Sequence, residues 1–177
     1  AQAEVIDRIV AIVDGHIITL SDIRQEREIR ALLGEKPIAD DAALAKQLTD
    51  SYLVEKQITD YPNIDVTDAE VQEALQKFDR RDGIIPERVR EAMRQRIRVQ
   101  KFFVVKFRES IRPSDDEIRK YYEDVFVSEA KKRGVSQVPP LSDTEMTAAI
   151  RENVIQERLD HEVGLWLDAI RRRSKIE

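Results

Sequence analysis

The 177-residue sequence predicts a mainly helical protein with a small β-hairpin at its start. Three stretches pair a Ser or Thr with a Glu three residues later, which is the pattern of a capping box at a helix start: Thr67–Glu70, Ser114–Glu117 and Ser142–Glu145. Apolar residues recur at intervals of three and four along most of the chain, as the buried face of a helix requires. The hairpin is indicated by Asp14-Gly15, which separates two runs of β-branched residues.

The Asp14-Gly15 dipeptide predicts a tight two-residue turn. A type I′ turn needs a positive φ at both central positions, and Asp-Gly is a favoured pair there. We therefore expect paired strands over residues 6–13 and 16–20. Because an isolated hairpin is only marginally stable in water, this one must pack on another part of the chain.

The first two helices follow the hairpin directly. Ser21 is the expected cap of a helix over residues 22–33, and Gly34 is its expected end. Asp40 is expected to open a second helix that continues toward Tyr61.

The capping boxes place later helix starts near residues 68, 115 and 143. Pro86 fits the first turn of another helix, because proline's missing amide costs nothing there. The last helix should extend to about Arg173, which makes it the longest element of the chain.

Composition excludes several classes of function. Charged residues make up 37% of the chain, but their signs alternate and the net charge is only −5, so we expect no nucleic-acid partner. No apolar run approaches the ~20 residues of a membrane span, so we expect no integral membrane segment. Cysteine is absent, and His16 and His161 show no ligand spacing, so we expect no metal site.

The sequence shows no motif for catalysis or for a cofactor. Its five glycines are scattered, so there is no phosphate-binding loop, and no Ser or Thr lies in a nucleophile motif. The acidic pairs Asp40-Asp41 and Asp115-Asp116 fall at helix starts, where carboxylates cap free amides. We therefore expect neither a catalytic residue nor a cofactor.

The segment Phe102–Phe107 has apolar residues in nearly every direction around a helix axis. We favour the interpretation that it forms a buried central helix. The alternative is that some of its aromatic side chains line a groove that accepts unfolded chain. The candidate peptide-binding residues are Phe102, Phe103, Phe107, Tyr121, Tyr122, Phe126 and Trp166.

Three phrases of the sequence resemble the SurA-type periplasmic chaperones and their parvulin-like relatives. They are IVAIVDGHIITLSDI at residues 9–23, RPSDDEIRKYYED at residues 112–124 and LWLDAIR at residues 165–171. The resemblance implies a helical chaperone module whose N-terminal hairpin is completed by the C-terminal helix. It also implies that Lys175–Glu177 begin a strand that pairs with the hairpin.

The same resemblance implies one composite domain, built from residues 1–126 and 140–177, with residues 127–139 as a linker. In the family, parvulin prolyl-isomerase domains usually occupy that interval. Such a domain needs about 90 to 100 residues. The interval is far too short for it, so we expect the isomerase site to be missing.

The function that the resemblance implies is that of an ATP-independent periplasmic chaperone module. Its partners would be unfolded or nascent outer-membrane proteins and aromatic-rich peptides. The opening Ala1-Gln2-Ala3, which is typical of a signal-peptidase site, agrees with secretion. Two alternatives stay open: a peptidyl-prolyl isomerase family member, and a structural or assembly module with a fixed partner. A homodimer formed by swapping the C-terminal helix is a further expectation.

Overall fold

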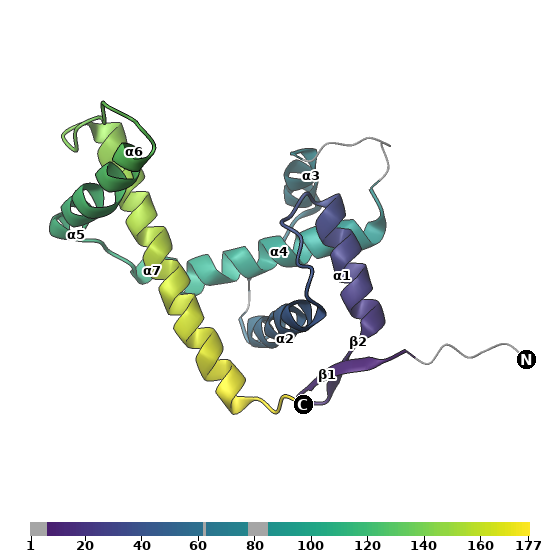
Figure 1. Ribbon diagram of the computed structural model, residues 1–177. Coiled ribbons are helices and arrows are strands. Elements are labelled where there is room, and N and C mark those ends of the chain that lie inside the picture. Colours follow the sequence, from purple (N-terminus) through teal and green to yellow (C-terminus); the bar gives the residue numbers. More distant parts are fainter. Residues whose placement is uncertain (1–6, 62, 78–84) are drawn as a thin grey trace, which may run out of the picture. The chain divides into compact units, whose positions relative to one another are not determined.

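The computed structural model describes residues 7–61, 63–77 and 85–177, and it is mainly helical with an N-terminal hairpin (Figure 1). In chain order the elements are β1 (Ile9–Val13), β2 (His16–Thr19), α1 (Leu20–Leu32), α2 (Asp41–Ile58), α3 (Asp68–Gln76), α4 (Glu87–Lys106), η1 (Arg108–Ser110), α5 (Asp115–Tyr121), η2 (Tyr122–Phe126), α6 (Val127–Lys132) and α7 (Thr144–Arg173). The chain divides into two compact units. Unit 1 contains Ala1–Phe102 and Trp166–Glu177, and unit 2 contains Phe103–Leu165.

The hairpin forms as its turn predicts. β1 and β2 are antiparallel, and the two turn residues have positive φ angles of 49° at Asp14 and 85° at Gly15. The strands are shorter than expected, because Leu20 already begins α1. Ile6 lies outside the described residues. The register shifts between Ile9 and Ala11, which marks a β-bulge in β1.

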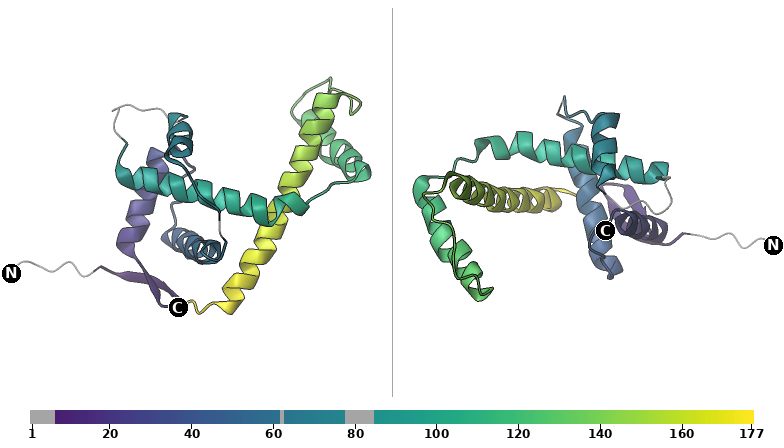
Figure 2. Two further views of the ribbon diagram at one scale, coloured as in Figure 1. Left: turned by 180° about the vertical axis from the view of Figure 1, so that it is seen from behind. Right: turned by 90° about the horizontal axis from the view of Figure 1, so that it is seen from above.

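The last residues of the chain pair with β1 through backbone hydrogen bonds and one isolated β-bridge, and they form no strand of their own. Asp14 N–H donates to the Lys175 carbonyl over 2.8 Å, and Val13 forms an antiparallel bridge with Ile176. Both views of Figure 2 show the C-terminus beside the hairpin. The expectation that the C-terminal residues complete the hairpin is confirmed.

The cap of α1 differs from the prediction. Thr19, not Ser21, caps the helix: its hydroxyl accepts from Asp22 N–H, and the Asp22 carboxylate accepts from Thr19 N–H over 2.7 Å. The residue three positions after Thr19 is Asp22, whose carboxylate can accept a hydrogen bond from the backbone of the cap. The residue three positions after Ser21 is Arg24, which cannot accept one, so of the two only Thr19 can form a capping box. Ser21 N–H donates instead to Asp7.

Three of the other predicted caps are confirmed, at Asp40, Thr67 and Ser114. The cap predicted at Ser142 is wrong, because α7 begins one residue later and the Asp143 carboxylate accepts from Met146 N–H over 2.9 Å. A carboxylate caps as well as a hydroxyl does, so the adjacent Asp can replace the Ser.

Pro86 lies immediately before α4 rather than in its first turn. Its carbonyl accepts from Val89 N–H over 2.9 Å, so proline still stands at the start of the helix.

Unit 1 contains a core that joins the two ends of the chain. Val13 and Ile18 of the hairpin pack with Leu53 of α2 and Ile170 of α7, and Trp166 is partly buried against them. A second group packs α1 against α3 and α4: Ile29, Leu33, Val71, Leu75, Val89 and Met93. The hairpin is therefore stabilised by residues far away in the sequence.

Unit 2 is built from α5, η2, α6 and the first part of α7, which lie side by side in Figure 1. Its core contains Ile118 of α5 with Ile150 and Val154 of α7. Residues 127–139 are not irregular throughout, since α6 occupies their first half. The helix continues there because the chain has no strong helix breaker before Gly134, where φ is 76°.

Candidate apolar binding site

The aromatic residues predicted to bind peptide are distributed over both units. Phe102 and Trp166 lie in unit 1, Phe103 and Phe107 lie at the start of unit 2, and the other three lie around η2. Tyr121, Tyr122 and Phe126 pack together on one hydrophobic cluster of unit 2.

Phe102 belongs to the core and not to a surface groove. Its side chain is 0% exposed, and its ring contacts the rings of Tyr61 and Trp166, with centroids 5.0 and 5.5 Å away. A client chain could reach Phe102 only if unit 1 opened. The inclusion of Phe102 among the binding residues is therefore corrected, and Trp166 is its packing partner.

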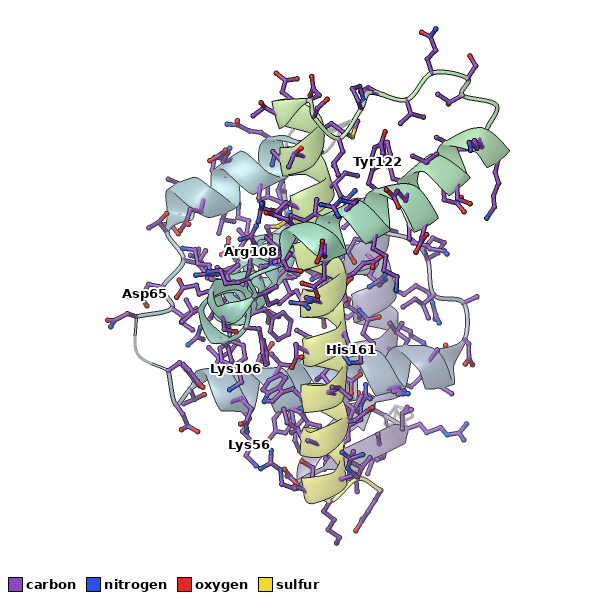
Figure 3. The ribbon with its side chains drawn as sticks, turned by 90° about the vertical axis from the view of Figure 1, so that its left-hand side faces the viewer. Lys56, Asp65, Lys106, Arg108, Tyr122 and His161 are labelled. Carbon is purple, nitrogen blue, oxygen red and sulfur yellow. The ribbon has the colours of Figure 1, made fainter. Side chains whose placement is uncertain are left out.

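Phe103 and Phe107 contact each other within unit 2. Their ring centroids are 6.2 Å apart, and Lys106 Nζ (Figure 3) lies 5.5 Å from the centroid of Phe107. The intervening Val104 and Val105 are exposed. The segment Phe102–Phe107 thus buries one side chain completely and leaves apolar surface on the opposite side.

Tyr122 and Phe126 lie on η2, a π-helical turn between α5 and α6. Such turns are rare and occur often at functional sites. The turn stacks the rings of Tyr122 and Phe126, with centroids 6.0 Å apart and an interplanar angle of 22°. Tyr122 Oη donates to the Pro139 carbonyl over 2.8 Å, and Figure 3 shows Tyr122 between the helical segment and the loop after α6.

An apolar pocket of about 340 Å³ lies between this helical segment and the loop. Its apolar lining consists of Tyr121, Val125, Phe126, Ala130, Val135, Val138 and Pro139. The polar residues Glu129, Arg133 and Gln137 complete the lining. Val125 is 39% and Val135 is 48% exposed, so the pocket opens to solvent.

Two titratable groups of the pocket, Tyr121 and Glu129, keep fixed charge states near neutral pH. Burial raises the pKa of Tyr121, and the nearby Glu157 carboxylate adds to the effect, so this phenol stays neutral. Glu129 accepts a hydrogen bond from Lys132 Nζ over 2.8 Å, which lowers the pKa of Glu129. These groups cannot supply an acid and a base that titrate near pH 7.

Ion pairs hold α5 and the preceding segment against α7. Glu117, which belongs to the Ser114 capping box, also pairs with Arg158. Arg108 (Figure 3) pairs with Glu152 at 2.5 Å. The pocket therefore rests on a scaffold that is tied together at two points inside unit 2.

Sequence reasoning found the helical wall of the pocket but missed its loop wall. Val135, Val138 and Pro139 lie in the range expected to be a linker. The available signal was the presence of two valines in an otherwise polar stretch with proline and glycine.

A second cavity, of about 480 Å³, lies in unit 1 beside a network of four charged side chains. Arg96 binds Glu35 at 2.5 Å and Glu26 at 2.9 Å, and Arg30 lies 3.1 Å from Glu35. Burial raises the pKa of Glu26. Two cations balance two anions here, so the arrangement is that of a structural ion-pair network.

Comparisons with known proteins assign no family. No protein-family model matches the chain, and no curated protein matches it. Within residues 7–61, 63–77 and 85–177, no three His, Asp or Glu side chains gather as metal ligands. None of the helices in the same ranges combines the length and the apolar character needed to cross a bilayer.

Proposed function

We propose that this chain is an ATP-independent periplasmic chaperone module that binds apolar segments of unfolded outer-membrane proteins and suppresses their aggregation. The observation that carries the proposal is the open apolar pocket at η2, where partly exposed Tyr121, Val125 and Phe126 face the loop of Val138 and Pro139. The resemblance to SurA-type chaperones supplies the compartment and the class of client.

The chemistry of the pocket suits weak and promiscuous binding. Apolar burial contributes about 25 cal/mol per Å² and has no directional requirement, so the client needs no fixed sequence. At about 340 Å³ the pocket holds one or two side chains and not a folded element. One buried Leu or Phe side chain contributes about 1.5–3 kcal/mol, so each contact is readily reversible.

The proposal is tested by light scattering of a denatured outer-membrane β-barrel protein that is diluted into buffer with the full chain. We expect the wild type to suppress scattering without ATP. Val125→Glu should lose most of this effect, because it places a carboxylate in the pocket at an exposed position that the fold tolerates.

The matched control is Ala149→Glu, which adds the same charge at an exposed position of α7 that does not line the pocket. It should suppress scattering like the wild type. Unchanged aggregation at a molar excess of the wild-type chain would contradict the proposal.

The enzyme alternative is a prolyl isomerase, and we propose that the chain is not one. The pKa of Tyr121 is raised and that of Glu129 is lowered, so both are moved away from neutral pH, and the interval that would hold a parvulin domain contains α6 and a loop. A proline-peptide isomerisation assay should show no acceleration by the full chain. Acceleration that depends on chain concentration would favour the alternative.

A further inference from the structure

The mouth of the apolar pocket carries a guanidinium that forms no salt bridge with a carboxylate of the described residues, although its charge contributes to lowering the pKa of the nearby Glu129. Arg133 lines the pocket and is exposed. The carboxylate next to it, that of Glu129, is bound by Lys132 Nζ at 2.8 Å. Within the described ranges of the chain, no carboxylate lies within ion-pair distance of Arg133.

This arrangement differs from that of the arginines that hold unit 2 together. Arg108 pairs with Glu152, Arg158 with Glu117, and Arg119 lies 3.2 Å from Asp116. Arg108 and Arg158 connect segments to α7 and Arg119 pairs within α5, whereas Arg133 stands beside an apolar surface.

The backbone fixes Arg133 at this place through a Schellman motif at the end of α6. Gly134 N–H donates to the Lys131 carbonyl over 3.0 Å, and Val135 N–H donates to the Ala130 carbonyl over 3.0 Å. Gly134 adopts the positive φ of 76° that the motif requires. The motif sets Arg133 and Val135 at the same pocket mouth, so a charged and an apolar contact lie next to each other.

We propose that the pocket prefers a bulky apolar side chain that is flanked by a carboxylate. The apolar group enters the pocket at η2, and the Arg133 guanidinium binds the carboxylate of the adjacent residue. The planar fork of arginine matches a carboxylate in two parallel hydrogen bonds. This inference rests on the proposed function and adds to it a rule for which client segments bind best.

The rule also excludes a class of segments. Glu129 is paired with Lys132, so Arg133 is the charged residue of the pocket lining that forms no salt bridge with a carboxylate of the described residues. Arg133 therefore repels a lysine or arginine that is adjacent to the bound apolar side chain of the client. A neutral residue at that position forms no ion pair with Arg133 and adds no affinity through it.

The test is an NMR titration of the full chain, isotopically labelled, with short acetylated peptides that contain one Phe. Three carry a C-terminal amide and differ in the residue after Phe, which is Asp, Asn or Lys. A fourth ends in Phe with a free carboxylate, so that a side-chain and a terminal carboxylate are compared. We expect the two carboxylate peptides to bind about threefold to tenfold tighter than the Asn peptide, and tenfold corresponds to about 1.4 kcal/mol.

Variants assign the preference to one side chain. In Arg133→Gln the preference for carboxylate should vanish, and in Arg133→Lys it should be partly kept. Lys131→Gln is the matched control. It removes the same charge at a position that is two residues from Arg133 and does not line the pocket. It should keep the wild-type preference. Salt at about 1 M should weaken the preference, since it screens charges beyond about 3 Å.

The outcomes separate this inference from the function on which it rests. If all Phe peptides shift the pocket resonances with equal affinity, or if the preference survives in Arg133→Gln, the inference is overturned and the proposed function stands. If no Phe peptide shifts those resonances, the proposed function fails and the inference fails with it.

Discussion

Ile12 and Glu177 exchange two backbone hydrogen bonds of 2.9 Å, so the last residue of the chain is paired with the first strand, β1. The same connection is repeated by side chains, because the Arg171 guanidinium binds the Asp50 carboxylate through two hydrogen bonds of 2.7 and 2.5 Å. Ile170 supplies the apolar part of this connection, in the cluster with Val13. Unit 1 therefore depends on residues that are more than a hundred positions apart in the sequence.

A mutation in the last turn of α7 should consequently destabilise the N-terminal half. Ile170 is 4% exposed, and Ile170→Ala should lower the free energy of unfolding by about 2–5 kcal/mol, through lost burial and a cavity. Leu165→Ala is the control, since that side chain is 53% exposed and its loss should change stability by less than about 0.5 kcal/mol. Urea unfolding followed by circular dichroism measures both.

Deleting residues 141–177 tests the composite domain directly. Residues 1–140 alone lack the pairing of Ile176 with β1 and the Ile170 contact, so they should not unfold cooperatively. A truncated chain that melted as sharply as the intact one would refute the dependence of the N-terminal hairpin on the C-terminal residues.

The local part of the fold could be predicted because it is encoded within a few residues. Thr67 and Ser114 each have a Glu three positions later, and the structure has both capping boxes. The prediction of Ser21 as the first cap is wrong, because it depends on residue type alone, whereas Thr19 has Asp22 three residues later and forms the capping box. Asp14-Gly15 likewise determines its own turn.

The site could be predicted only in part, because burial and pocket walls depend on partners that are distant in sequence. Phe102 and Phe126 are both aromatic residues in helical segments. Phe102 is fully enclosed by Tyr61, Trp166 and their neighbours, while Phe126 lines an open pocket. No local pattern separates these two outcomes. The π-helical turn at η2 also has no signature in the sequence.

The loop wall of the pocket should loosen when its link to Tyr122 is removed. Tyr122→Phe deletes the hydrogen bond to the Pro139 carbonyl, which contributes about 0.5–1.5 kcal/mol. We expect faster hydrogen exchange at the amides of residues 134–138 and little change in the rest of unit 2. Tyr52→Phe is the control, because the Tyr52 hydroxyl forms no hydrogen bond with any of the described residues. Equal exchange in the wild type and Tyr122→Phe would mean that the loop is held by packing alone.

The homodimer expected from swapping of the C-terminal helix stays a prediction. The contacts that such a swap would exchange are those of Ile170 and of Arg171 with Asp50. Sedimentation velocity over a range of concentrations should then show a dimer fraction that rises with concentration. A constant monomer value at all concentrations would contradict the swap.

Acid should destabilise the protein partly through Glu70. Lys101 Nζ lies 2.6 Å from Glu70 Oε1, and the Thr67 amide also donates to this carboxylate. With the Lys101 hydrogen bond as the larger cause, these contacts lower the pKa of Glu70 from 4.5 to about 2. A carboxyl group whose pKa is lowered by folding stabilises the native state at pH values above the pKa that the group has in the unfolded chain. This stability is lost as the pH falls from about 4.5 toward 2.

Glu70→Gln should remove this contribution while keeping the capping box, since glutamine also serves at that position. The urea midpoint of the wild type should therefore fall more between about pH 7 and about pH 3 than that of Glu70→Gln. Glu73→Gln is the control, because Glu73 is an exposed carboxylate of the same helix outside the capping box. It should follow the wild-type curve. If Glu70→Gln showed the full wild-type loss in acid, the ion pair with Lys101 would not stabilise the folded protein.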